Sequence, residues 1–307
     1  MQMYQVNFNT GKIFLILFFG VFGISTAAIF VKLATETTGL DGIGFSLFLA
    51  ASRLIISSLL MFPFWKQLKH AKIQPNAIRY IRYSILAGIC LAIHYATWFL
   101  SLSYTSVTAS TAIVTTCPIW VALISRFFFG EKLSKETIIG ITIATFRGLI
   151  IANDGMKGGT PAQNPILGNL LSLVSAWVYS IYFLFGKEAQ RKGLVTSLYA
   201  VIAYSASAIT LFPLPYFFQT NYIGHPIIVY LYIFLMAIFA QIIGQNCLNL
   251  SLRWTSPIIV TLAVMFEPIF AGILAYIVFD EAPSYILLIG VTILLIGVGV
   301  TAVNLKT

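Results

Sequence analysis

The chain has 307 residues, of which 59% are hydrophobic and only 9% are charged, and its mean hydropathy is +0.93. Because an ordinary soluble domain is about 25% charged, this composition excludes a soluble globular protein and indicates an integral membrane protein. The net charge of +9 would suggest nucleic acid as a partner of a soluble protein, but we predict no such partner here, since the basic residues lie mainly in loops between apolar segments.

Ten apolar segments follow one another along the chain, each long enough to form a membrane-crossing helix of roughly 20 residues. Continuous apolar runs of this length exclude the short alternating strands of a membrane β-barrel. We therefore predict an all-α integral membrane protein with ten transmembrane helices, the first of them a retained helix rather than a signal peptide. The predicted spans are 13–34, 43–65, 83–102, 105–127, 137–153, 166–187, 196–217, 227–251, 256–278 and 285–304.

Lys and Arg concentrate in alternate loops between these spans. The loops after the second, fourth and sixth spans are rich in them, whereas the connections between these loops are nearly bare. Short loops rich in Lys and Arg remain in the cytoplasm, so we predict a multi-pass protein of the inner (plasma) membrane with both termini in the cytoplasm. The basic residues of these loops are Lys66, Lys69, Lys72, Arg79, Arg82, Arg126, Lys132, Lys135, Lys187, Arg191 and Lys192.

Spans two to four contain the first candidates for a functional site. A charge at mid-bilayer costs about 2.5 to 3.5 kcal/mol and persists mainly where it faces the bundle interior or a wet cavity, which makes Arg53 a candidate intramembrane charge. His94 and Trp98 lie four residues apart on one helical face. With Tyr95, they offer a titratable ring and aromatic surfaces for an organic substrate, or else simple packing. Pro118 predicts a bend in span four.

Spans six and eight contribute polar and aromatic candidates. Gln241, Gln245 and Asn249 recur at every fourth position of span eight and form one polar stripe on an apolar helix. Amide groups both donate and accept hydrogen bonds, which suits a polar or zwitterionic substrate. The alternative is that they join helices, as polar side chains in membranes also do. Trp177 and Tyr179 of span six are weaker candidates for the substrate site.

Span nine contains Glu267, the one acidic residue within a predicted span. A carboxylate there is a candidate for binding a substrate amine or for taking up and releasing a proton, and His94 is the second candidate for proton coupling. The alternative is a structural ion pair with Arg53. Pro268 follows directly and predicts a bend, so we regard Pro118 and Pro268 as candidate gating points.

The sequence repeats itself at an offset of 150 residues, and the first and sixth spans match at an offset of 155. Because each copy holds five predicted helices, an odd number, the second copy lies upside down in the membrane relative to the first, as in many secondary transporters. We predict repeats at 1–153 and 166–307. The matches include Leu100–Ser106 with Leu250–Ser256, Pro118 with Pro268, Glu131 with Glu281, Ser25 with Ser180, and Lys32 with Lys187.

This layout resembles the EamA-like family of the drug/metabolite transporter superfamily. The resemblance rests on the two copies of a segment running from (Y/W)TS through Pro-Ile to (G/D)E, on Glu267-Pro268, and on the FGEKLS stretch that starts at Phe129. It covers essentially the whole chain and implies a carrier of amino acids or other metabolites. Lys32 and Arg53 lie where the family often has basic residues. Arg147 departs from the pattern, because the family usually has apolar or small residues there.

The leading functional hypothesis is a secondary active transporter, by elimination as well as by resemblance. The sequence has no nucleophile elbow, P-loop or metal-ligand pair, so we expect no enzyme activity, cofactor or metal. The expected substrates are small polar or amphipathic metabolites, with amino acids or related compounds exported by alternating access. The expected partners are a small-molecule substrate and the lipid bilayer. The sequence leaves open whether the protein forms a homodimer. The alternatives are a nucleotide-sugar or phosphometabolite antiporter, a membrane-embedded enzyme, and a non-transporting receptor or scaffold.

Overall fold

The computed structural model describes residues 10–40, 42–66, 77–105, 107–128 and 164–280, with a few single positions between 130 and 146. Eight helical segments of this described part are long and apolar enough to cross a membrane. They coincide with predicted spans one to four and six to nine, which confirms an all-helical membrane protein. The tenth predicted span, 285–304, and all but isolated positions of the fifth, 137–153, lie outside the described residues, and so does Arg147.

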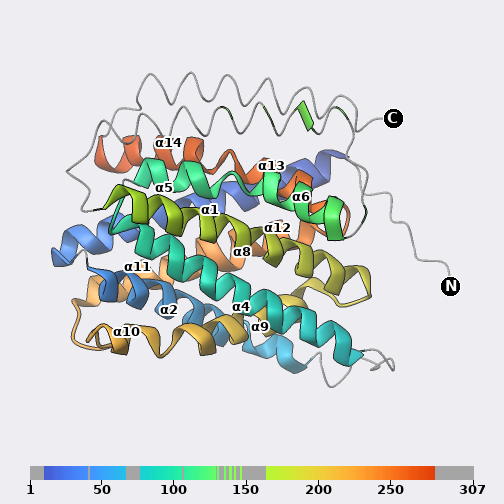
Figure 1. Cartoon of the computed structure of the whole chain (residues 1–307). Coiled ribbons are helices and arrows are strands. Elements are labelled where there is room, and N and C mark those ends of the chain that lie inside the picture. The colour runs from blue at the N-terminus through green and yellow to red at the C-terminus, as the bar shows by residue number, and fades with distance from the viewer. Residues whose placement is uncertain are drawn as a thin grey trace.

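The helices run along one common direction and form a single layered bundle (Figure 1). Span eight is one continuous rod that changes from α-helix to π-helix and back. In chain order the elements are α1 (Thr10–Thr38), α2 (Ile43–Leu60), the 3₁₀ helix η1 (Phe62–Trp65), α4 (Ala77–Leu102), α5 (Val107–Val114), α6 (Cys117–Phe128), α8 (Pro165–Arg191), α9 (Thr196–Leu211), α10 (Leu214–Phe217), α11 (Ile227–Met236), the π-helix η2 (Ala237–Gln245), α12 (Asn246–Ser251), α13 (Pro257–Val264) and α14 (Glu267–Phe279).

Spans four and nine are each divided into two helices near their proline. α6 begins one residue before Pro118, and α14 begins one residue before Pro268. A proline is tolerated at a helix start, because the first N–H groups of a helix have no intrahelical acceptor. Both spans are therefore interrupted at positions that the sequence repeat relates to one another.

Helices of the first repeat pack mainly on helices of the second. α1 lies along α11, η2, α12 and α14, while α4 lies along α8 and α9. The Ser25 hydroxyl donates to the backbone oxygen of Glu267 at 3.1 Å, and the Ser180 hydroxyl donates to the backbone oxygen of Cys117 at 3.1 Å. Ser25 matches Ser180 and Cys117 matches Glu267 in the sequence repeat. Each bond is thus the counterpart of the other with the repeats exchanged.

The crossing of α1 and η2 depends on two glycines. A Cβ atom added to Gly244 would lie 2.5 Å from the backbone nitrogen of Ile24. One added to Gly23 would lie 2.7 Å from the Cα atom of Gly244. Small residues let helix backbones approach closely in membrane proteins, and this crossing leaves no room for a larger residue.

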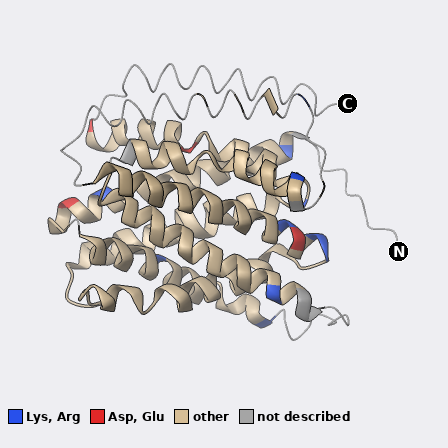
Figure 2. Ribbon diagram, viewed as in Figure 1, with Lys and Arg blue, Asp and Glu red and all other residues tan. Residues whose placement is uncertain are grey.

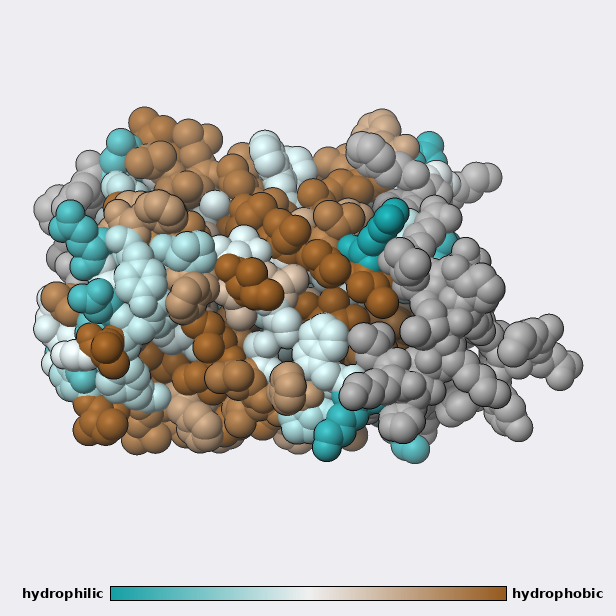
Figure 3. All heavy atoms as spheres, turned by 90° about the horizontal axis from the view of Figure 1, so that it is seen from below, coloured by the Kyte–Doolittle hydropathy of each residue, from teal (hydrophilic) through white to brown (hydrophobic). Residues whose placement is uncertain are grey.

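The outer surface is apolar along the middle of the bundle. The face formed by α2, α9 and α10 shows mostly hydrophobic side chains between more hydrophilic ends (Figure 3). On this face Ile209 is 75% exposed and Phe217 is 77% exposed. Apolar side chains exposed in this way suit a hydrocarbon environment. Lys and Arg gather toward the end of the bundle where α6 and α8 end (Figure 2).

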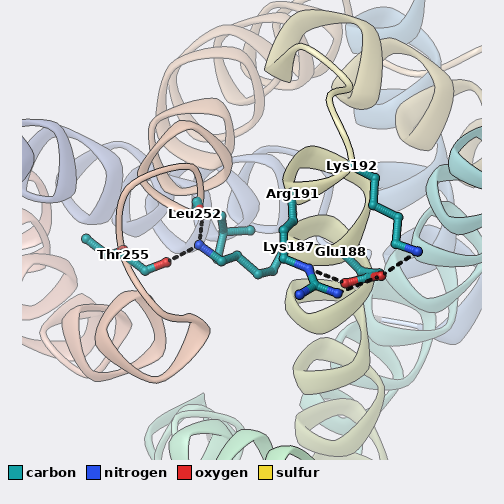
Figure 4. A network of polar contacts seen from close by, with 6 residues as sticks. All are labelled: Lys187, Glu188, Arg191, Lys192, Leu252 and Thr255. Carbon is teal, nitrogen blue, oxygen red and sulfur yellow. Dashed lines mark hydrogen bonds and ion pairs between the residues drawn. The ribbon is translucent and has the colours of Figure 1, made fainter. Parts of the chain in front are cut away.

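At this basic end, α8 is attached to the connection between α12 and α13 (Figure 4). Lys187 Nζ donates to the backbone oxygens of Leu252 at 2.7 Å and of Thr255 at 2.9 Å. An ammonium group suits this place, because carbonyl groups at a helix C-terminus lack intrahelical donors and carry partial negative charge. Glu188 forms ion pairs with Arg191 and Lys192 on the next turn, at 2.9 and 3.1 Å.

We expect Gly244→Ala to lower the free energy of unfolding by about 1 to 3 kcal/mol, because the added methyl group overlaps the backbone of α1. Thermal unfolding of the detergent-purified protein measures this as a lower Tm. Gly42→Ala is the control, since a Cβ atom there meets nothing within 4 Å and the loss is confined to the preference for Gly over Ala at a helix N-cap. Equal Tm losses in the two variants would contradict the close helix crossing.

Candidate functional site

A narrow cavity lies where helices of the two repeats meet. Its walls come from α1, α2, α4, α5, α8, η2 and α14, and its volume is about 30 Å³, room for about two water molecules. It brings together many of the side chains that the sequence marked as candidates and adds small and apolar ones. The candidates that line it are Arg53, His94, Tyr95, Trp98, Tyr179, Gln245 and Glu267, and the additions are Ile24, Ala27, Thr111 and Val114.

Arg53 is held in the cavity wall by Gln241 and Tyr95. The Arg53 side chain is only 2% exposed, and its Nε and Nη2 atoms donate to Gln241 Oε1 at 3.1 and 2.7 Å. The Tyr95 hydroxyl donates to the same oxygen at 2.9 Å, and the guanidinium carbon lies 4.2 Å from the centre of the Tyr95 ring. Hydrogen bonds and stacking together fix the plane of the guanidinium group.

Three buried N–H groups beside this arrangement have no acceptor among the described residues. They are Arg53 Nη1, Gln241 Nε2 and Trp98 Nε1. A buried donor without an acceptor costs about 1 to 3 kcal/mol, and more when it is charged. Arg53 and Trp98 are both among the residues that line the cavity.

Glu267 reaches the cavity from the break in span nine. It is the first residue of α14, where the positive end of the helix dipole favours a carboxylate. Arg53 lines the same cavity, yet no ion pair joins it to Glu267 among those formed by the described residues. A cation and an anion therefore border one small space without direct contact.

His94 is fixed by aromatic stacking and by a serine of α8. Its ring lies 4.1 Å from the Tyr179 ring at an interplanar angle of 10°, and 6.3 Å from the Trp98 ring at 4°. His94 Nδ1 lies 2.7 Å from Ser175 Oγ. Ser175 was not among the predicted site residues. It lies within a row of small polar residues on α8 that also contains Ser172, and both are fully buried.

The three amides of span eight all accept hydrogen bonds from side chains of other helices. Besides the bonds at Gln241, the Tyr179 hydroxyl donates to Gln245 Oε1 at 3.0 Å, and the Tyr182 hydroxyl donates to Asn249 Oδ1 at 2.7 Å. Of the three amides, Gln245 is the one that lines the cavity. Gln241 and Asn249 lie behind the wall and position Arg53, Tyr95 and Tyr182.

Trp177 lies away from the cavity. Its side chain is 41% exposed and packs edge to face on Trp120 at 5.2 Å between ring centres. Pro118 and Pro268 lie at the helix breaks rather than in the cavity wall. Within the described ranges, His, Cys, Asp and Glu side chains do not gather in threes that would hold a metal ion.

Comparison with known proteins gives consistent matches over nearly the whole chain. The model of the EamA-like transporter family matches residues 10–152 and again residues 166–303. An uncharacterized transporter of Archaeoglobus fulgidus is 25% identical over 282 residues, which cover 89% of this chain and 91% of that protein. An uncharacterized transporter of Clostridium kluyveri is 24% identical over 75% of this chain and 74% of its own length.

A solved structure, described as the crystal structure of a protein, shares the fold. It aligns with a TM-score of 0.73 over 96% of this chain and 98% of its own, at 17% sequence identity. The arrangement of helices is therefore one that has been seen experimentally in another protein.

We expect Gln241→Leu to destabilise the protein by more than about 2 kcal/mol, because it leaves two donors of a buried charge and one hydroxyl without an acceptor. Gln245→Leu is the matched variant, since it removes mainly the bond from Tyr179 and should cost about 1 kcal/mol. Thermal unfolding in detergent compares them. A Tm loss in Gln245→Leu as large as in Gln241→Leu would contradict the central place of Gln241.

Proposed function

The chain belongs to the EamA-like transporter family, and we propose that it is a secondary active transporter of small polar or amphipathic metabolites, with amino acids or related compounds as exported substrates. The observation that carries this proposal is the cavity, because it lies between the two repeats and is lined by polar residues from both. Relatives named as transporters support the general function.

The proposed architecture has ten spans in two inverted repeats of five. The exchanged pair of hydrogen bonds, Ser25 with Glu267 and Ser180 with Cys117, supports a two-fold relation between the repeats. The basic end of the bundle (Figure 2) supports a cytoplasmic position for that end in the plasma membrane, since Lys and Arg remain on the cytoplasmic side.

The proposed mechanism is alternating access between the two repeats. A cavity of about 30 Å³ is too small for an amino acid, so helices must separate before a substrate enters. The helix breaks before Pro118 and Pro268 lie beside the cavity and supply points of bending, as discontinuous helices do in other carriers.

The charge of the cavity favours amino acids over phosphorylated substrates. An antiporter of nucleotide sugars or phosphometabolites needs several Lys or Arg side chains around the phosphates. Among the residues that line the described cavity, Arg53 is the one Lys or Arg. In the proposed cycle, Glu267 takes up and releases the coupling proton. Proton uptake by a carboxylate needs no cofactor.

Counterflow into proteoliposomes tests this function. With a panel of amino acids, purines and vitamins, we expect the parent protein to give saturable exchange that responds to a pH gradient. Glu267→Gln should lose the response to the gradient, because a carboxamide does not take up a proton at the pH values of the assay. Trp177→Phe is the control and should behave as the parent.

Two outcomes would count against the proposal. Exchange that is unchanged by both Glu267→Gln and His94→Asn would contradict the assignment of these residues. An absence of exchange by protein shown to be folded would favour a receptor or scaffold instead.

A further inference from the structure

Arg53 uses only part of its capacity to donate hydrogen bonds. Two of its nitrogens are bonded to Gln241, whereas Nη1 is buried and has no acceptor among the described residues. Stacking on Tyr95 at 4.2 Å keeps the group from turning to find another acceptor. A guanidinium fork held in this way matches the planar oxygens of a carboxylate.

A second donor on the cavity wall has the same need. Trp98 Nε1 is buried without an acceptor, and the Trp98 ring is fixed by stacking on His94 and by edge contact with Phe99 at 5.0 Å. Indole N–H groups only donate. Arg53 and Trp98 lie on different helices, α2 and α4, and both line the cavity.

The charges that line the cavity restrict the kind of ligand that carries such an anionic group. Among the described residues that line the cavity, Arg53 is the one Lys or Arg and Glu267 is the one Asp or Glu. A ligand with only a carboxylate would pair with Arg53 but leave Glu267 unpaired, and a ligand with only an amine would do the reverse. An uncompensated charge in a water-poor interior is unfavourable.

We propose that the cavity recognises a zwitterion through two separate anchors, with the substrate carboxylate at Arg53 and Trp98 and the substrate ammonium group at Glu267. Arg53 is then a specificity-determining residue and not the structural partner of Glu267. The inference rests on the proposed transport function and adds which residues bind each charge of the substrate, and hence the orientation in which it binds.

The test is a binding measurement that does not require transport. The twenty L-amino acids are each added to the detergent-purified protein, and binding is followed as a ligand-dependent rise in Tm. For each amino acid that binds, the matching amine without the carboxylate and the matching acid without the amine are compared. We expect each singly charged analogue to bind at least about 100-fold more weakly than the amino acid.

Two variants assign the anchors to their charges. In Arg53→Gln, the preference for the amino acid over its amine should fall at least about tenfold, while the preference over its acid is kept. In Glu267→Gln, the preference for the amino acid over its acid should fall, while the preference over its amine is kept. Because Arg53 is part of a buried network, Trp98→Phe provides a second probe of the same anchor, since it keeps the ring and removes one donor to the carboxylate.

The outcomes separate this inference from the proposed function. Charge-selective binding without counterflow would keep the zwitterion site and remove the transporter. Counterflow of a neutral or singly charged solute, with no amino acid raising the Tm, would overturn the zwitterion site and keep the transporter. Equal binding of an amino acid and its two analogues would also overturn it.

Discussion

The oxygen of the Gln241 side chain is the point on which the interior of this bundle depends. A guanidinium group placed among apolar helices must find its acceptors within the protein, because lipid offers none. Gln241 Oε1 accepts from Arg53 twice and from Tyr95 once, so a single atom joins α2, α4 and η2. It lies within a π-helix, a rare conformation that is often found at functional sites. The hydrogen bonds to this oxygen hold the Arg53 guanidinium group in the cavity wall.

The duplication supplies a symmetric frame, and substitutions within it supply an asymmetric site. The frame is visible in Ser25 and Ser180, whose hydroxyls bind the residue that precedes the proline of the opposite repeat at equal distances. That residue is Cys117 in one repeat and Glu267 in the other. The same helix break therefore carries a carboxylate in one repeat and a thiol in the other. Tyr95 and Gln245 are also related by the repeat, and both line the cavity.

Sequence patterns predicted the frame better than the site. Eight predicted spans agree with helices of the described part, because apolar runs of about 20 residues have few alternatives. Prolines at related positions indicated where spans four and nine are interrupted. The sequence was less informative about which side of a helix faces inward, since lipid is as apolar as the interior. Trp177 and Tyr179 were equal candidates, yet Tyr179 lines the cavity and Trp177 does not. The bond between Arg53 and Gln241, 188 positions apart, required the fold.

The small cavity connects the charge arrangement to the transport cycle. In this structure, Arg53 and Glu267 border a space with room for about two water molecules, and they do not pair with each other. Closing the bundle around two separated charges removes the water that would stabilise them in an open state. A zwitterion between the anchors, or a proton on Glu267, lowers that penalty, whereas an empty and unprotonated site does not. Under the proposed mechanism, the carrier therefore crosses between its open states more readily when loaded, which is the condition for coupling one flux to another without leakage.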